Sequence, residues 1–393
     1  MNPLPPSTEP SPFEVHASEA VLDDLRRRLE ATRWPQALLP GWALGTATDY
    51  LRSVVDYWQQ EFDWRARERW LAEALPSERV TIRGMELHFA RVRGRGSRPF
   101  PLLLLHGWPS SYVEMAELAA LLAEPAVGAN SQAGDFDCFE LIVPSIPGHG
   151  FSEAPRDPRF GADEAADHLR DLMVDVLGYS RFGAHGGDRG AFVATGLGHR
   201  HPDHVVGIHL SLAMGLPGPL EDRSPEETRW LEEIAEWQRL EAGYSAVQST
   251  KPLSLAYGLM DSPVGLAGWI LEKFQAWSDC EGDPEPCFSR DMLLTNVMVY
   301  WLSGSIGTSM QYYWAHRVAP PIALRPERIE VPTGFALFPK EVMRPPRSVI
   351  ERKYALTRWT EMERGGHFPA LEESAALARE IRAFFEELRV SGG

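Results

Sequence analysis

Five short, almost purely apolar runs alternate with helical patterns from residue 100 onward, and this alternation restricts the chain to few folds. The runs are PLLLL (101–105), FELIVP (139–144), RFGAHG (181–186), VVGIHL (205–210) and VPTGFALF (331–338). Strands that are buried on both faces of a parallel sheet have this composition. Because helical segments separate the runs, the sequence predicts an α/β sheet with right-handed crossovers.

The alternation is interrupted between residues 216 and 322. This stretch is rich in helix formers and aromatic residues and has none of the short apolar runs. We therefore predict a helical cap inserted over the sheet, which divides the core into residues 96–215 and 323–393. Ligands of open parallel sheets bind beyond the carboxyl ends of the strands, so we expect the binding site between sheet and cap.

The first 95 residues have a different pattern. After a Pro- and Ser-rich stretch of about ten residues, which we expect to be mobile, two segments carry apolar residues at helical spacing: ASEAVLDDLRRRLEATRWP and DYLRSVVDYWQQEFDW. VTIRGMELHFARV then alternates like a hairpin, with Arg83-Gly84 as its turn. We expect this N-terminal extension (1–95) to wrap the core and buttress the cap. Whether it also forms a homodimer contact stays open.

Composition and charge exclude several classes of protein. The chain has 393 residues, of which 44% are hydrophobic and 24% charged, as in ordinary globular proteins. No apolar stretch reaches the roughly 18 residues that span a bilayer, and the N-terminus lacks the pattern of a secretory signal. We therefore expect a soluble protein that does not bind membranes. The net charge of −16 argues against nucleic acid and anionic lipid as partners.

The three cysteines, Cys138, Cys280 and Cys287, make no disulfide framework, and the sequence contains no metal-ligand spacing. A reducing cytoplasm is therefore the compartment that we expect, and no metal or other cofactor is indicated.

Residues 185–194, HGGDRGAFVA, lie where an apolar segment passes into a helical one. The spacing small-x-nucleophile-x-small is typical of the strand–turn–helix elbow that normally presents a serine in hydrolases. Here Asp188 occupies the nucleophile position. A carboxylate is a weak nucleophile toward esters, but it can displace a leaving group from saturated carbon. The product is an alkyl ester of Asp188, a covalent intermediate.

Hydrolysis of such an ester needs further groups, and the sequence offers each of them in a loop at the same edge of the predicted sheet. His367, in GGH, can activate water, and Glu341, after VPTGFALF, can stabilise the resulting imidazolium. The order nucleophile, acid, histidine is the one expected for this fold. The backbone N–H groups of Trp108 and Arg189 are in the right places to form an oxyanion hole.

Each of these residues also has a purely structural interpretation. Asp188 could cap the following helix, and His367 could be a surface residue in a glycine-rich loop. Three further glutamates compete with Glu341 for the position of the acid: Glu351, Glu361 and Glu363. The combination of the elbow, HGWP, an acid after a strand and GGH favours the catalytic interpretation.

Nine segments together resemble the microsomal-type branch of the epoxide hydrolases, a family of the α/β-hydrolase fold. They cover nearly the whole chain and are PFEVHASEAVLDDLRRRLEATRWP, HGWPSSYVEM, PSIPGHGFSEAP, GGDRGAF, GYSAVQSTKP, DSPVGLAGWILEKF, LLTNVMVYW, VPTGFALFPKE and RGGHFPALEE. The resemblance implies a cofactor-free enzyme that converts an epoxide and water to a vicinal diol. In it, Asp188 would be the nucleophile, His367 the base and Glu341 the charge partner.

The resemblance also implies two cap tyrosines that hydrogen-bond the epoxide oxygen. By position these are Tyr244, in GYSAVQSTKP, and Tyr313, in SMQYYW. An opening epoxide expels a poor leaving group that must be protonated, and a phenol with a pKa of about 10 can donate its proton at neutral pH. Tyr312 is a direct rival of Tyr313, and Tyr257 and Tyr300 are weaker rivals.

The chain departs from the family pattern in two places. The membrane-bound members begin with an apolar anchor, which we do not expect in this protein, and Arg189 stands where many members carry tryptophan. For the Arg189 side chain we favour a structural role, such as pairing with an acid, over recognition of an acidic substrate group. Fluoroacetate dehalogenases also have arginine after the nucleophile, but they use a second arginine where this chain has Phe192. That dehalogenase activity is the alternative to epoxide hydrolysis. A non-catalytic binding protein is disfavoured because every catalytic position is filled.

The expected substrate is a hydrophobic epoxide, with aryl epoxides included. Trp108 is expected to contact it beside the two cap tyrosines. The cap is apolar and aromatic at Trp269, Phe274, Trp277 and Trp301, although these side chains could equally form the core of the cap.

Overall fold

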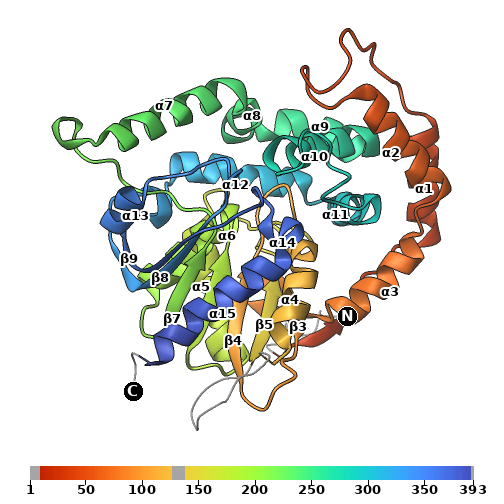
Figure 1. The fold of residues 1–393 in the computed structure, drawn as a ribbon. Helices are drawn as coiled ribbons and strands as arrows, with labels where there is room; N and C mark the ends of the chain where they lie inside the picture. The colour runs from red at the N-terminus through yellow and green to blue at the C-terminus, as the bar shows by residue number, and fades with distance from the viewer. Residues whose placement is uncertain (1–8, 126–137, 391–393) are drawn as a thin grey trace.

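The computed structural model describes residues 9–125 and 138–390 (Figure 1). Most of the Pro- and Ser-rich stretch that we expected to be mobile lies outside the described residues.

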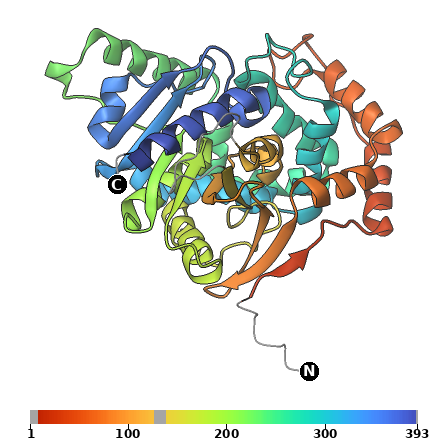
Figure 2. The same ribbon diagram turned by 60° about the horizontal axis from the view of Figure 1, so that its bottom comes forward.

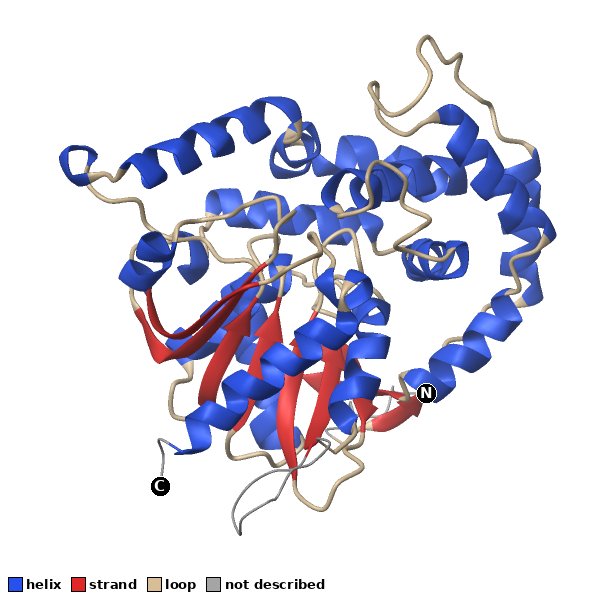
Figure 3. Cartoon of the chain, in the orientation of Figure 1, coloured by secondary structure: helices blue, strands red, loops and turns tan. Residues whose placement is uncertain are grey.

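A single nine-stranded sheet forms the centre of the described chain (Figure 3). Its spatial order is β1 (Ser11–Phe13), β2 (Ser77–Ile82), β3 (Met85–Val92), β5 (Cys138–Pro144), β4 (Pro99–Leu105), β6 (Phe182–Gly186), β7 (Val205–Leu210), β8 (Ile329–Leu337) and β9 (Tyr354–Glu361). The pairs from β1 to β5 are antiparallel, and the pairs from β5 to β9 are parallel. The predicted fold class, an α/β-hydrolase fold with a mostly parallel sheet, is confirmed.

The apolar runs became strands because both of their faces are buried. In β4, Leu102 and Leu104 belong to the core on one side of the sheet, whereas Leu103 and Leu105 belong to the core on the other side. All five predicted strands are present as β4 to β8. The predicted hairpin turn is also confirmed, since Arg83 and Gly84 join β2 to β3 with φ of 50° and 76°.

Two edge strands, β1 and β9, were not predicted. β9 (Tyr354–Glu361) is mostly half-exposed, with side chains such as Thr357 and Arg358 in its middle, so it contains no apolar run. An edge strand that is open on one side does not need a run of apolar residues.

Helices cover both faces of the parallel part of the sheet (Figures 1 and 3). One face carries α4 (Ala116–Ala123), α14 (Pro369–Glu372) and α15 (Ser374–Val390). The other face carries α5 (Ala162–Asp171) and α6 (Asp188–Arg200). α13 (Arg347–Lys353) leads into β9.

The helices between β7 and β8 lie over the carboxyl ends of the strands (Figure 1). They are α7 (Pro225–Leu240), α8 (Gly243–Thr250), α9 (Pro252–Asp261), α10 (Pro263–Trp277), α11 (Arg290–Ser303) and α12 (Ile306–Val318). Proline or a serine cap opens several of them: Ser262, for example, accepts a hydrogen bond from the N–H of Gly265 and Pro263 follows.

The N-terminal helices α1 (Glu19–Glu30), α2 (Thr48–Gln60) and α3 (Trp64–Ala74) form an arc along one side of the molecule (Figures 1 and 2). They contact the cap. Arg28 forms an ion pair of 2.8 Å with Asp261, and the Arg67 guanidinium donates to Thr295 at 2.8 Å. At the start of this region, β1 pairs with β2. Sequence analysis missed α3.

Cys280 and Cys287 form a disulfide, with their Cα atoms 5.9 Å apart. The prediction that the cysteines make no disulfide is therefore wrong for this pair. A turn brings the two residues together, because the N–H of Cys287 donates to the carbonyl of Pro284 and that of Asp283 to the carbonyl of Cys280. Cysteine usage thus gives no support to a reducing compartment. In the part of the chain that the structure describes, no helix is long and apolar enough to cross a membrane.

Candidate active site

Asp188 lies at the turn between β6 and α6, in a left-handed conformation with φ of 42°. A non-glycine residue adopts such a conformation rarely, and mostly where the surrounding structure enforces it. Two glycines allow the turn to pack this tightly. A Cβ atom on Gly190 would lie 2.1 Å from the carbonyl oxygen of Leu105, and a Cβ atom on Gly107 would lie 2.4 Å from the Cβ of Asp188. The sequence motif is therefore a steric requirement for presenting the carboxylate.

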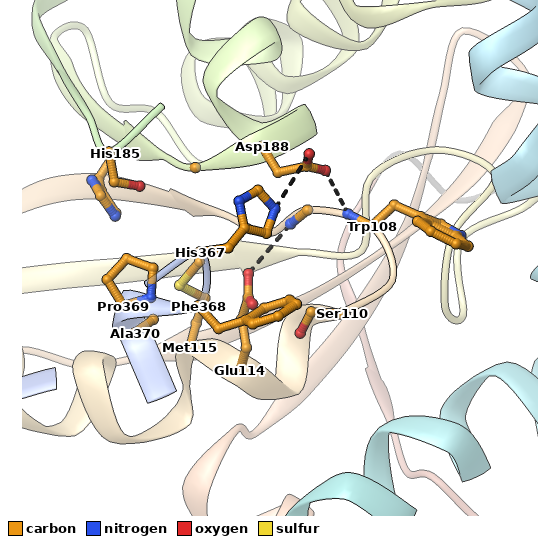
Figure 4. Close-up of a pocket in the computed structure, with 13 residues that line it drawn as sticks. Trp108, Ser110, Glu114, Met115, His185, Asp188, His367, Phe368, Pro369 and Ala370 are labelled. Carbon is orange, nitrogen blue, oxygen red and sulfur yellow. Dashed lines mark hydrogen bonds and ion pairs between the residues drawn. The ribbon is translucent and has the colours of Figure 1, made fainter. Parts of the chain in front are cut away.

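The two oxygens of the Asp188 carboxylate face different groups (Figure 4). Oδ1 accepts a hydrogen bond of 2.7 Å from the backbone N–H of Trp108, and Oδ2 lies 3.6 Å from Nε2 of His367. Burial alone would favour the neutral acid. His367, Arg189 and the Trp108 N–H outweigh it, however, and lower the pKa of Asp188 to about 2. The group is therefore an anion at neutral pH, as a nucleophile requires.

His367 and Glu341 form a buried pair next to the Asp188 carboxylate. Nδ1 of His367 lies 2.6 Å from Oε1 of Glu341, and both side chains are almost inaccessible to solvent. Burial opposes the charge on the ring, but Glu341 and Asp188 together raise the pKa of His367 well above its ordinary value. The competing glutamates Glu351, Glu361 and Glu363 are exposed. The structure thus brings Glu341, and none of its three rivals, to His367.

The loop that carries His367 is fixed by Glu372. One oxygen of the Glu372 carboxylate accepts from the N–H groups of Asp279 and Gly366, and the other accepts from the N–H of Phe368. His367 itself donates its backbone N–H to the carbonyl of Trp277 at 2.9 Å. Sequence analysis missed Glu372, because a glutamate in RGGHFPALEE gives no sign that its carboxylate folds back onto the preceding loop.

Glu114 is a second carboxylate that sequence analysis missed. It lines a cavity of about 20 Å³ together with Asp188 and His367 (Figure 4). This is room for one water molecule. The Glu114 side chain is buried and accepts a hydrogen bond of 3.3 Å from the N–H of Gly107. Burial raises the pKa of Glu114 to about 7.

The two predicted cap tyrosines meet over the site. Tyr244, on α8, stacks on Trp108 with ring centroids 5.3 Å apart, and Tyr313, on α12, stands edge-on to Trp108 at 5.7 Å. The centroids of the two tyrosines are 5.8 Å apart. Burial raises the pKa of both phenols, and the Asp188 carboxylate adds to the effect. Both therefore keep their protons at neutral pH.

The rival tyrosines are occupied elsewhere. Tyr312 donates its hydroxyl hydrogen to the carbonyl of Gly161, and Tyr300 donates to the carbonyl of Ser110. Tyr257 is 75% exposed. By contrast, the hydroxyl of Tyr313 is buried and has no hydrogen-bond partner among the described residues. This leaves Tyr313 available to a ligand.

We expected the Arg189 side chain to pair with an acid, but its partners in the structure are a tyrosine and a histidine. Its guanidinium stacks on the ring of Tyr313 and donates to Nδ1 of His316 at 2.7 Å. Of the two N–H groups expected in the oxyanion hole, that of Trp108 reaches Asp188. Within the described residues the backbone N–H of Arg189 makes no hydrogen bond to that carboxylate.

The four cap aromatics separate into two groups. Trp277 reaches the site, with its ring 5.1 Å from Tyr244 and 5.0 Å from His367. Phe274 stacks on Phe368 in the core. Trp301 lies under the guanidinium of Arg28, next to the N-terminal helices, and Trp269 packs in the partly buried margin of the core.

Comparison with known proteins identifies the family of the chain. Residues 10–115 match the family model described as "Epoxide hydrolase N terminus", and residues 101–254 match the one described as "alpha/beta hydrolase fold". A putative epoxide hydrolase of Stigmatella aurantiaca is 38% identical, and the alignment covers 96% of this chain and 85% of that protein. The chain belongs to the epoxide hydrolase family. Epoxide hydrolase 1 of Oryctolagus cuniculus is 37% identical over 95% of this chain and 88% of its own.

Two solved epoxide hydrolases share the fold over nearly the whole chain. The crystal structure of juvenile hormone epoxide hydrolase from Bombyx mori has a TM-score of 0.90 at 31% identity, covering 99% of this chain and 96% of that one. The Aspergillus niger epoxide hydrolase has a TM-score of 0.82 at 30% identity, with 98% and 97% covered. These relatives give no support to the dehalogenase alternative.

Proposed function

We propose that this epoxide hydrolase opens hydrophobic epoxides to vicinal diols through an ester on Asp188. The observation that carries the proposal is the ionised carboxylate of Asp188, which lies against the Trp108 N–H and His367 beneath two buried, protonated phenols. The site thus contains a nucleophile that can attack carbon and a base that can activate water. It also contains two acids that can protonate an oxygen leaving group.

In the first step, an oxygen of Asp188 attacks a ring carbon of the epoxide. The bond between that carbon and the epoxide oxygen breaks, and its electron pair stays on the oxygen. Tyr244 and Tyr313 hydrogen-bond this oxygen, and one of them donates its proton to it. The negative charge thereby passes from the nucleophile to a phenolate of the cap.

In the second step, water attacks the ester carbonyl of Asp188. Formation of the ester removes one of the two anions beside His367, so the pKa of the ring falls and the imidazolium can return a proton to the cap phenolate. The neutral ring then accepts a proton from water. The buried Glu341 stabilises the imidazolium that results, and the Trp108 N–H stabilises the oxyanion. Collapse releases the diol and regenerates the carboxylate beside the imidazolium, which is the resting state of the site. The balance requires only epoxide and water.

The site favours an apolar substrate. The rings of Trp108, Tyr244 and Trp277 stack on or lean against one another at the site, and together they offer flat apolar surface next to a small number of polar groups. Styrene oxide, an aryl epoxide, is therefore a suitable first substrate.

The remaining expectations stay predictions. The division into an extension (1–95), core (96–215 and 323–393) and cap (216–322) predicts that limited proteolysis cuts between these parts. A cytoplasmic location and a homodimer formed through the extension can be tested by fractionation and by light scattering.

The direct test is diol formation from styrene oxide, measured by chromatography. We expect the wild type to form the diol and Asp188→Asn to lose at least about a thousandfold in kcat/KM. The matched control is Asp203→Asn, which changes an exposed aspartate of the same type outside the site. An Asp188→Asn variant with wild-type turnover would refute the proposal.

A further inference from the structure

The Arg189 side chain is the part of the site that the reaction above leaves without a role. Its Cζ atom lies 3.6 Å from the ring centroid of Tyr313 and 5.4 Å from that of Phe192. Its Nη1 donates to Nδ1 of His316 at 2.7 Å, since a guanidinium can only donate. Residues of α6 and α12 therefore hold the cation against the face of one cap tyrosine.

Arg189 has no acidic partner of its own. Within the described ranges, no carboxylate lies close enough to its guanidinium for an ion pair of 4.0 Å or less. Lys273 is the useful contrast. It lies 4.9 Å from the ring centroid of Tyr244, but Glu272 neutralises it at 2.5 Å. Of these two described cations beside the tyrosine pair, Arg189 is therefore the one that has no carboxylate within 4.0 Å.

Ring opening moves a negative charge toward this cation. Before the reaction the charge resides on Asp188, whose pKa Arg189 helps to lower. After the reaction Asp188 is a neutral ester, and the charge resides on the epoxide oxygen or on the phenol that has protonated it. A guanidinium against the Tyr313 ring is positioned to stabilise the second state, because cation–π and charge–charge attraction both increase when the phenol ionises.

We propose that Arg189 is a positioning residue for ring opening: its guanidinium, stacked on Tyr313, orients this phenol and stabilises the negative charge that reaches it when its proton passes to the epoxide oxygen. The inference rests on the proposed function and goes beyond it, because it makes Tyr313 the stronger of the two acids. It also explains why an arginine can follow the nucleophile in an enzyme whose substrate carries no acidic group.

The charges that face Tyr313 support this assignment. Burial raises the pKa of Tyr313, Arg189 of α6 opposes that rise, and Asp188 adds to it. Tyr244 of α8 and Tyr300 of α11 are the other titratable groups near this phenol, and both are neutral. His316, which bonds Arg189, has a pKa well below its ordinary value because of burial and the adjacent guanidinium, so it adds no charge.

The first experiment replaces Arg189 by methionine, which keeps the length of the side chain and removes its charge, and by lysine, which keeps the charge. Rapid-quench mass spectrometry follows formation of the Asp188 ester from styrene oxide. We expect Arg189→Met to slow ester formation about ten- to a hundredfold with a smaller change in KM, and Arg189→Lys to restore part of the rate. The alkaline limb of the ester-formation rate should move to higher pH in Arg189→Met.

The second experiment is a double-mutant cycle with Tyr313→Phe. If Arg189 acts through Tyr313, Arg189→Met costs little further rate in the Tyr313→Phe background. Equal losses in both backgrounds would overturn the proposal, as would an alkaline limb that does not move. A rise in KM confined to epoxides that carry a carboxylate, with neutral epoxides unaffected, would instead make Arg189 a substrate-binding residue.

An ultraviolet titration separates failure of this inference from failure of the proposed function. The difference in tyrosinate absorbance between wild type and Tyr313→Phe isolates the titration of Tyr313, and it needs no turnover. Arg189→Met should displace that titration to higher pH. A wild type that opens no epoxide would refute the function, whereas an unchanged Tyr313 titration would refute the coupling to Arg189.

Discussion

Replacing Glu114 by glutamine tests the electrostatics of the buried site through stability. Burial raises the pKa of this carboxyl from 4.5 to about 7 in the folded protein. At about 1.4 kcal/mol per pKa unit, this corresponds to about 3 kcal/mol of unfolding free energy. A glutamine side chain at this position has nearly the same shape, still accepts a hydrogen bond from the N–H of Gly107, and never ionises.

The sign follows from proton binding. Between pH 4.5 and 7 the folded protein keeps the Glu114 proton that the unfolded chain releases, so the free energy of unfolding falls as pH rises through this range. Below pH 4.5 wild type and Glu114→Gln should therefore be similarly stable with respect to this group. Above pH 7 the variant should be more stable by about 3 kcal/mol.

Urea unfolding at several pH values between about 4.5 and 8.5 measures this difference. Glu117→Gln, which changes an exposed glutamate of the same segment, is the matched control and should track the wild type. A wild-type-minus-variant difference that does not change with pH would refute the reasoning, because the carboxyl would then titrate alike in the folded and unfolded states.

Three further predictions follow from the site and its surroundings. Glu341→Gln should slow hydrolysis of the ester about 10²- to 10⁴-fold, because His367 loses the anion at 2.6 Å. The ester should then accumulate to a level that mass spectrometry detects, and a normal rate with no accumulation would contradict this role. Gly190→Ala should destabilise the fold by several kcal/mol in thermal unfolding, since its Cβ would lie 2.1 Å from a carbonyl oxygen of β4; an unchanged melting temperature would contradict the packing. Reduction of the bond between Cys280 and Cys287, which are 7 positions apart, should lower stability by about 2 kcal/mol; identical unfolding with and without reductant would contradict it.

The sequence was sufficient for the parts of the fold that local composition determines. The runs at β4 to β8 are apolar because both of their faces are buried. Glycine is required at Gly107, Gly186 and Gly190 because a Cβ atom there would lie less than 2.5 Å from a neighbouring atom. Such constraints leave a visible pattern. Asp188 and Glu341 each closely follow such a run, so their place at one edge of the sheet could be predicted, and His367 was assigned from the chain order of nucleophile, acid and histidine.

What the sequence did not reveal depends on contacts between distant segments. The carboxylate of Glu372 folds back onto the His367 loop, Glu114 turns inward beneath Gly107, and Arg189 meets Tyr313 on a helix more than 120 positions away. No local pattern marks these partners, because each depends on where the cap and the loops come to lie. The half-exposed strand β9 was missed for the opposite reason, since it lacks an apolar run.

The covalent ester on Asp188 is the central claim, and isotope incorporation tests it most directly. The enzyme is incubated with styrene oxide through many turnovers in ¹⁸O-water, and the peptide that contains Asp188 is then weighed. If water attacks the ester carbonyl, the Asp188 carboxylate acquires heavy oxygen while diol forms. Diol formation without label in this peptide would mean that water opens the epoxide directly, and the account of Asp188 as the nucleophile would be wrong.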